Sequence, residues 1–186
     1  RYITSGNNNT LIGQSAGLNL STGVGNIALG PLSFGSGALT GEQNVAFGCC
    51  AGYSLTSSSH SFMVGHKAMG TATATGSHNH AFGYYALTDL TSGSCNIAIG
   101  RQAGQNINTG AQNVFIGTNA GDADNDGNYQ IFIGCGAGLY MQGDTNIGLG
   151  FQSLRGSTTA TNNTGTDNVA IGMYAGQSNT SGTQNV

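Results

Sequence analysis

The sequence predicts an all-β fold, a parallel β-solenoid (β-roll) of about ten coils with about 17 residues in each coil. Three observations predict it: a five-residue word recurs ten times, the intervals between its closing glycines are nearly constant, and 33 of the 186 residues are glycine. Helical repeats are longer, at about 33 residues or more. Glycine inside a helix also costs ~1 kcal/mol at each position. A helical repeat is therefore excluded.

The recurring word, Asn-aliphatic-small-aliphatic-Gly, is the predicted strand of each coil. The words span residues 9–13, 26–30, 44–48, 61–65, 79–83, 96–100, 113–117, 130–134, 146–150 and 168–172, and an eleventh begins at Asn185. The intervals between their closing glycines differ by one or two positions at most, except for the longer interval between Gly150 and Gly172. We therefore expect one repeat domain over residues 1–186, with a five-residue excess in that interval.

Positions in each repeat, numbered from the Asn of the word as position 0, differ in side-chain size. Positions +1 and +3 are bulky or β-branched, as in Ile97 and Ile99, whereas +2 is mostly Ala and +7 is Ala or Ser. Successive strand residues point to opposite faces, so both faces of the sheet are predicted to be dry. We expect the +3 column, including Ile99, to be buried in the core, and the +2 and +7 columns to pack against partner chains.

The recurring polar and glycine positions predict how coils connect and stack. Glycine at +4 indicates a corner that needs a positive φ or close backbone approach. Glycine also stands at −3 in every repeat except at Ser58, usually after Thr or Ser, which indicates a turn. Equivalent positions should stack at ~4.8 Å. The Asn column is therefore predicted to form a ladder of hydrogen bonds from coil to coil.

Three words carry a family resemblance: Asn-Val-Ala-Phe-Gly-x-x-Ala at 44–51, Asn-Ile-Ala-Ile-Gly-x-x-Ala at 96–103 and Asn-Val-Ala-Ile-Gly-x-x-Ala at 168–175. They resemble the head repeats of trimeric autotransporter adhesins, and are similar to the Asn/Gly repeats of phage and giant-virus fibre proteins. The resemblance covers all ten repeats. It implies a homotrimeric, parallel, left-handed β-roll in a fragment of a longer extracellular fibre protein, at a cell surface or on a virion. The period departs from the family, because the adhesin-head repeat is shorter.

Composition excludes several classes of function. Four Lys and Arg against seven Asp and Glu leave no basic surface for nucleic acid, and no apolar run reaches the ~18 residues of a membrane span. No catalytic motif is present, so we do not expect an enzyme. We expect a structural fibre or adhesin segment that supports surface attachment, with a cell-surface receptor or glycan as partner.

The alternative function is an ice- or polysaccharide-binding β-solenoid, which would use a column of hydroxyl side chains. Position −4 offers such a column, which Asp126 and Gln142 interrupt; its first members are Ser5, Thr22, Thr40, Ser57, Thr75, Ser92 and Thr109.

Two sets of residues are candidate metal ligands. Asp122, Asp124 and Asp126 precede Gly127 with the alternation of a calcium loop, but Ile133 stands where such a loop has its bidentate carboxylate. This cluster is either a Ca²⁺ site or a plain acidic turn. His60 and His78 occupy the same position of adjacent coils, and either share a metal with His66 or form a solvated turn pair.

Two further interpretations concern His80 and the cysteines. His80 replaces an aliphatic residue at +1, where we expect a local irregularity of the core. Cys49 and Cys135 share position +5 but lie five coils apart, too far for a disulfide. Cys50 and Cys95 lie two coils apart at different corners, so we expect buried free thiols.

Overall fold

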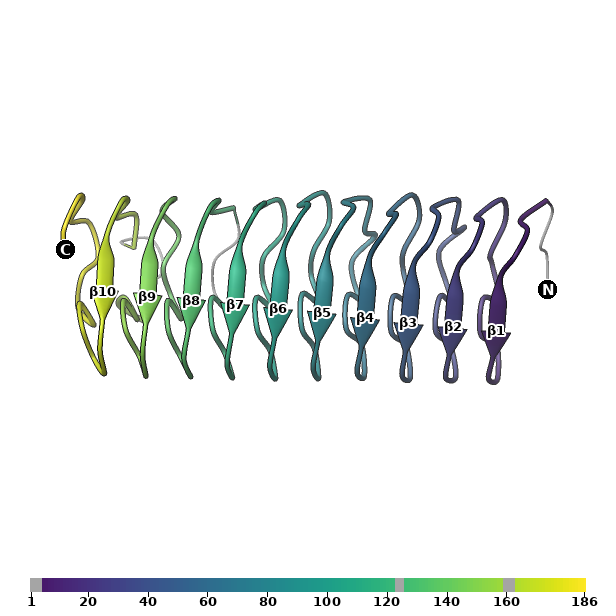
Figure 1. The fold of residues 1–186 in the computed structure, drawn as a ribbon, viewed down its shortest axis with the longest axis horizontal. Coiled ribbons are helices and arrows are strands. Elements are labelled where there is room, and N and C mark those ends of the chain that lie inside the picture. Colours follow the sequence, from purple (N-terminus) through teal and green to yellow (C-terminus); the bar gives the residue numbers. More distant parts are fainter. Residues whose placement is uncertain (1–4, 123–125, 159–162) are drawn as a thin grey trace.

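The computed structural model describes residues 5–122, 126–158 and 163–186, and it confirms the predicted β-solenoid (Figure 1). Ten parallel strands form one sheet in chain order, and the described residues contain no helix. Each strand consists of positions +1 to +3 of its word. The strands are β1 (Thr10–Ile12), β2 (Ile27–Leu29), β3 (Val45–Phe47), β4 (Phe62–Val64), β5 (His80–Phe82), β6 (Ile97–Ile99), β7 (Val114–Ile116), β8 (Ile131–Ile133), β9 (Ile147–Leu149) and β10 (Val169–Ile171).

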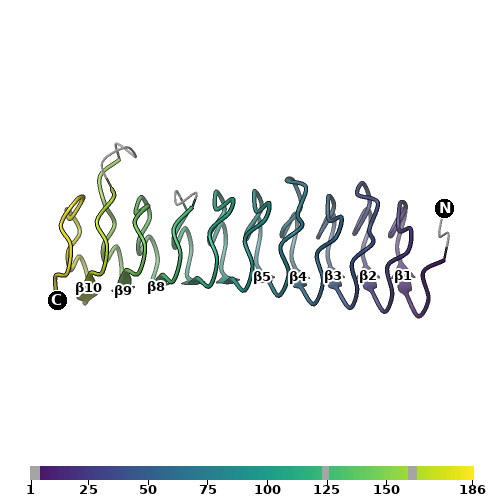
Figure 2. The same ribbon diagram turned by 90° about the horizontal axis from the view of Figure 1, so that it is seen from above.

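The strands pair in phase, so that each position of a repeat stacks on the same position of the next. In β6 and β7, for example, Ile97 pairs with Val114 and Ile99 pairs with Ile116. The sheet lines one long side of the rod, and the turns project on the other side (Figure 2). Equivalent side chains therefore form columns along the rod, as the repeat spacing predicts.

The Asn column forms the predicted ladder between coils. Asn26 is buried, and its side-chain oxygen accepts the backbone N–H of Asn44 at 2.9 Å. Its amide nitrogen donates to the carbonyl of Gly41, in the turn before the next word, at 2.9 Å. Asn96 and Asn113 repeat this arrangement. The Asn residues of the ladder thus satisfy the backbone of the coil that follows them, where an unpaired buried group would be costly. Gln130 is the exception, because its side-chain oxygen is buried and has no partner among the described residues.

The core of the rod differs from the expected one. Ala98 at +2 and Ala103 at +7 are fully buried inside the coil of a single chain, whereas Ile99 at +3 is 42% exposed on the outer side of the sheet. The expectation that the +3 column forms the core, with the Ala columns facing partner chains, is therefore wrong. A further interior column completes the core opposite the strands: Leu20, Leu39, Leu55, Ala74, Leu90, Ile107 and Met141.

Positions +2 and +8 of the same coil share one interior space, and no coil has Phe or Leu at both. Where +2 is Phe, +8 is Gly: a Cβ on Gly138 would lie 2.2 Å from the Phe132 ring. Where +8 is Phe or Leu, +2 is Ala or Gly, as in Ala81 with Leu87. The fourth coil has Met, an unbranched and adaptable side chain, at both positions. Three coils, such as that of Ala98 and Gly104, have a small residue at both positions, and large side chains of neighbouring coils lie beside Gly52 and Gly104. Interiors are close-packed, so a coil this narrow accepts at most one branched or aromatic side chain from the pair.

The glycine corner at +4 satisfies both predicted reasons for glycine. Gly100 has a φ of +138°, and a Cβ on it would lie 2.6 Å from the carbonyl oxygen of Gly117 in the next coil. An L side chain meets backbone there that cannot move aside, so close stacking of the coils requires glycine at this column.

The five-residue excess is closed at its base by one side chain. Asn163 is buried, accepts the backbone N–H of Ser157 at 2.8 Å and donates to the Ser157 carbonyl at 2.7 Å. These two bonds hold together the segments on either side of the excess. The regular stacking of the coils therefore continues after the excess, because the backbone N–H of Asn168 still donates to the Asn146 side-chain oxygen at 3.1 Å.

Candidate functional site

The outer face of the sheet is the most extensive candidate site. It consists of the +1 and +3 side chains of all ten strands, and we call it the outer face. The bulky residues that the sequence places in these columns lie here, half-buried or exposed, because their positions alternate with the interior +2 position. Exposed members include Ile12, Ile27, Leu29, Ile99, Ile133 and Ile171.

The outer face carries no Asp, Glu, Lys or Arg at any of its twenty positions. Aromatic rings cluster on it, where Phe62 makes edge-to-face contacts with Phe47 and Phe82 at centroid distances of 5.8 and 5.0 Å. His80 is half-buried on this face beside Phe62, so the expected irregularity of the core is instead a polar position outside it. An exposed apolar surface of this length is typical of a protein–protein contact.

The acidic turn is only partly described. Asp122 accepts hydrogen bonds from the side-chain amides of Asn119 at 2.8 Å and Asn106 at 3.3 Å, and burial raises its pKa above the ordinary value. Asp126 accepts the hydroxyl proton of Thr109 in the preceding coil. Asp124 lies outside the described residues. Calcium binding by these three carboxylates therefore stays a prediction.

The histidines are not brought together as one metal site. His60 and His78 stack face to face with ring centroids 5.0 Å apart, whereas His66 stacks on Tyr84 at 5.5 Å. Within the described residues no group of three His, Cys, Asp or Glu side chains is arranged to hold a metal ion. The solvated turn pair is the interpretation that this geometry favours.

Part of the hydroxyl column at −4 is engaged within the rod, while Thr22, Ser57 and Ser92 are exposed. Thr40 and Thr75 donate their hydroxyl protons to the carbonyls of Thr56 and Thr91, both at 3.3 Å. Hydroxyl groups oriented toward the backbone of the next coil are less available to a bound ligand. This column is therefore a weaker candidate site than the outer face.

The cysteines are more accessible than expected. Cys95 and Cys135 are exposed, which corrects the expectation of a buried thiol for Cys95, and Cys49 and Cys50 are half-buried. The two adjacent thiols lie close together, with the sulfur atoms 3.2 Å apart. The sequence shows that Cys49 and Cys50 are adjacent, but it does not show that their thiols meet. Adjacent side chains diverge in a strand and converge only at a corner.

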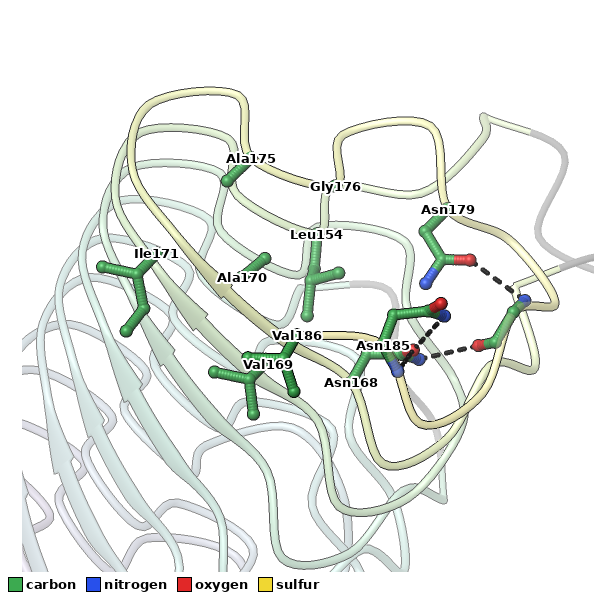
Figure 3. Close-up of a pocket in the computed structure, with 11 residues that line it drawn as sticks. Leu154, Asn168, Val169, Ala170, Ile171, Ala175, Gly176, Asn179, Asn185 and Val186 are labelled. Atoms are coloured by element: carbon green, nitrogen blue, oxygen red, sulfur yellow. Dashed lines mark hydrogen bonds between the residues drawn. The ribbon is translucent and has the colours of Figure 1, made fainter.

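A cavity of about 540 Å³ opens at the C-terminal end of the rod beside β10 (Figure 3). Leu154 and Ala170, which belong to the interior columns, line it together with Asn168 and Asn185. Asn185 donates to the Asn168 side-chain oxygen at 2.7 Å and so extends the ladder by one step. The lining of this cavity therefore includes interior residues of the coil that carries β10.

Comparisons with protein-family models, with curated proteins and with solved structures find no match to this chain. Among the described residues there is also no helix of the length and apolar character that crossing a membrane requires.

Proposed function

We propose that this protein is a structural segment of a homotrimeric extracellular fibre or adhesin, on a cell surface or a virion, where it supports surface attachment to a receptor or glycan. The proposal assigns it no catalytic role. The observation that carries it is the uncharged apolar outer face, which extends along all ten strands. The resemblance of the repeats to adhesin heads and viral fibres supports the extracellular setting.

The partner that fits the outer face best is a second copy of the same chain. The face is periodic, because equivalent side chains recur at the ~4.8 Å spacing of paired strands. Only a partner with the same period and length covers every coil in the same way. A parallel copy meets this condition without any further matching of sequence.

Three copies around one axis suit the two columns of the face. The +1 and +3 residues are the first and last residues of each strand, so the +1 column can face one neighbouring copy and the +3 column can face the other. A cyclic arrangement of this kind closes and leaves neither column in water. Aromatic side chains such as Phe62 and Phe82 would then lie in the interior of the trimer.

The experiment compares the assembly of outer-face and turn variants. One chain has a mass of 18.7 kDa. In sedimentation velocity or light scattering, the wild-type particle should have three times this mass. The double variant Ile99→Asp, Ile116→Asp places two charges of each copy in the contact, so it should sediment as a folded monomer with an unchanged circular dichroism spectrum.

Tyr129→Asp is the matched control. Tyr129 is 61% exposed on a turn outside the outer face, with a φ of 57° that Asp tolerates. This variant should remain trimeric. A monomeric wild-type chain, or loss of assembly in both variants, would contradict the proposal.

A further inference from the structure

The adjacent thiols of Cys49 and Cys50 form a small site that the proposed function does not use. They occupy positions +5 and +6, immediately after the Gly48 corner, where Cys50 adopts a left-handed backbone with a φ of 60°. This bend turns both side chains to the same side of the chain, and the sulfur atoms lie 3.2 Å apart. In an extended strand the same two residues would point to opposite faces.

Neighbouring coils hold the backbone of this corner on both sides. The Cys50 N–H donates to the carbonyl of Pro31 in the preceding coil at 3.0 Å, and the Cys49 carbonyl accepts the N–H of Lys67 in the following coil at 3.1 Å. The proximity of the two thiols is therefore built into the stacking of three coils.

A small reagent can reach the site from solvent. A cavity of about 390 Å³ lies beside Cys50, with Tyr53, Thr71 and Lys67 among its lining residues, and Cys49 is itself partly exposed to solvent. The Lys67 ammonium lies over the Tyr85 ring at 5.4 Å and places a positive charge near the thiols. Anionic thiol reagents are thereby favoured over neutral ones.

Metal binding fits the site less well than oxidation does. A structural zinc ion needs four ligands, with Zn–S bonds of ~2.3 Å. The described residues provide no third His, Cys, Asp or Glu side chain arranged with this pair. Cys95 and Cys135 stand at other positions of other coils, so each of the two thiols has only its neighbour as a disulfide partner.

We propose that Cys49 and Cys50 are a redox modification site, which low-molecular-weight disulfides such as glutathione disulfide oxidise to a reversible disulfide between the two adjacent residues. The Cys49 thiolate attacks one sulfur of glutathione disulfide and releases one glutathione. Cys50 then loses its proton to solvent, and its sulfur displaces the second glutathione from Cys49. Two thiols are oxidised to one disulfide, and the oxidant is reduced to two glutathione thiols.

The chemistry of the pair sets the order and the reversibility of these steps. Burial and the hydrogen bond with Cys49 raise the pKa of the Cys50 thiol, which lowers the fraction of Cys50 present as the attacking thiolate. The Cα atoms of adjacent residues are ~3.8 Å apart across a trans peptide, closer than the ~4.4–6.8 Å usual for disulfides. The ring is therefore strained, and a dithiol should reopen it readily.

Tryptic digestion separates the cysteine sites, so mass spectrometry can measure the modification of each site on its own peptide. Trypsin cleavage after Lys67, Arg101 and Arg155 places Cys49 and Cys50, Cys95, and Cys135 on three different peptides. The full chain is treated with glutathione disulfide, blocked with N-ethylmaleimide, then denatured and digested. The peptide 2–67 should lack two hydrogens and carry neither label, and a dithiol applied before blocking should restore two maleimide groups.

The exposed single thiols and one variant provide the controls. Cys95 and Cys135 have no neighbouring thiol and should retain glutathione adducts or maleimide. In Cys50→Ser the mixed disulfide on Cys49 has no resolving thiol, so its glutathione adduct should persist. The proposal is overturned if the wild-type peptide 2–67 carries glutathione or two maleimide groups, or if its disulfide joins two chains on a non-reducing gel.

Discussion

Exchanging the sizes of Phe132 and Gly138 tests the packing of the interior. These residues stand at +2 and +8 of one coil, and the Phe132 ring occupies the space where a Cβ on Gly138 would lie, 2.2 Å away. The double variant Phe132→Ala, Gly138→Leu reproduces the pair that the chain already uses at Ala81 and Leu87. Leu87 has a φ of 49° and Gly138 a φ of 59°, so both positions have the same backbone conformation.

The single changes should each be severe. Phe132→Ala leaves a cavity inside the coil and should lower the free energy of unfolding by ~3–5 kcal/mol. Gly138→Leu overpacks the same space, at ~1–3 kcal/mol, and adds ~1–2 kcal/mol for a left-handed non-glycine residue. In the double variant the clash is absent and the leucine refills much of the cavity. Because the two sites are in contact and their effects do not add, it should be more stable than Phe132→Ala alone by ~1–2 kcal/mol.

Urea unfolding followed by circular dichroism, at one fixed protein concentration, measures these differences. The control combines Phe132→Ala with Gly52→Leu, which overpacks a coil five repeats away against Phe34 and Met63. That pair shares no cavity, so its losses should add. If Phe132→Ala, Gly138→Leu is less stable than Phe132→Ala alone, the two positions do not share one interior space and the packing argument fails.

Three further predictions concern the ladder, the corner and the acidic turn. Gln130→Asn should raise the free energy of unfolding by ~1 kcal/mol, because the buried Gln130 side-chain oxygen has no partner among the described residues, and chemical denaturation measures this. Gly100→Ala should destabilise more than Gly25→Ala, since both glycines have a positive φ but a Cβ on Gly25 would meet only the Gln43 side chain at 3.5 Å, whereas one on Gly100 would meet the Gly117 carbonyl oxygen at 2.6 Å; melting temperatures compare them. Burial raises the pKa of Asp122, so the folded chain binds this proton more tightly than the unfolded chain, and stability should fall as pH rises from the ordinary to the raised pKa. Calcium bound by Asp122 and Asp126 would displace that proton, so carboxyl NMR titrations with and without Ca²⁺ should differ; identical titrations would exclude the metal.

The register of the rod could be predicted because it depends on spacing alone. A constant interval between words places equivalent residues side by side, so the strand positions, the Asn ladder and the Gly100 type of corner follow from the sequence. The inside of the coil could not be read in the same way. Alternation shows that Ala98 and Ile99 point in opposite directions, but it does not show which direction is inward.

Side-chain volume was the signal that could have settled the direction. Large residues at +2, such as Phe115 and Phe132, coincide with Gly at +8, and this size matching marks +2 as interior. The sizes of the residues at +1 and +3 show no such relation to the size of the residue at +8. So short a coil encloses too little space for two bulky side chains from each strand, so those residues must lie outside.

This division between a small interior and a bulky exterior makes assembly depend on the length of the rod. Covering a half-exposed outer-face side chain yields ~1 kcal/mol, whereas association carries a cost of ~4–15 kcal/mol that does not grow with the number of coils. The outer face has twenty such positions. Once about fifteen of them are covered, the free energy gained reaches even the upper end of the association cost. A rod of only a few coils has too few such positions. Chains shortened by whole coils should therefore keep their β-solenoid signature in circular dichroism while their trimers dissociate at progressively higher concentrations, and a dissociation constant that did not change with coil number would locate the contact elsewhere.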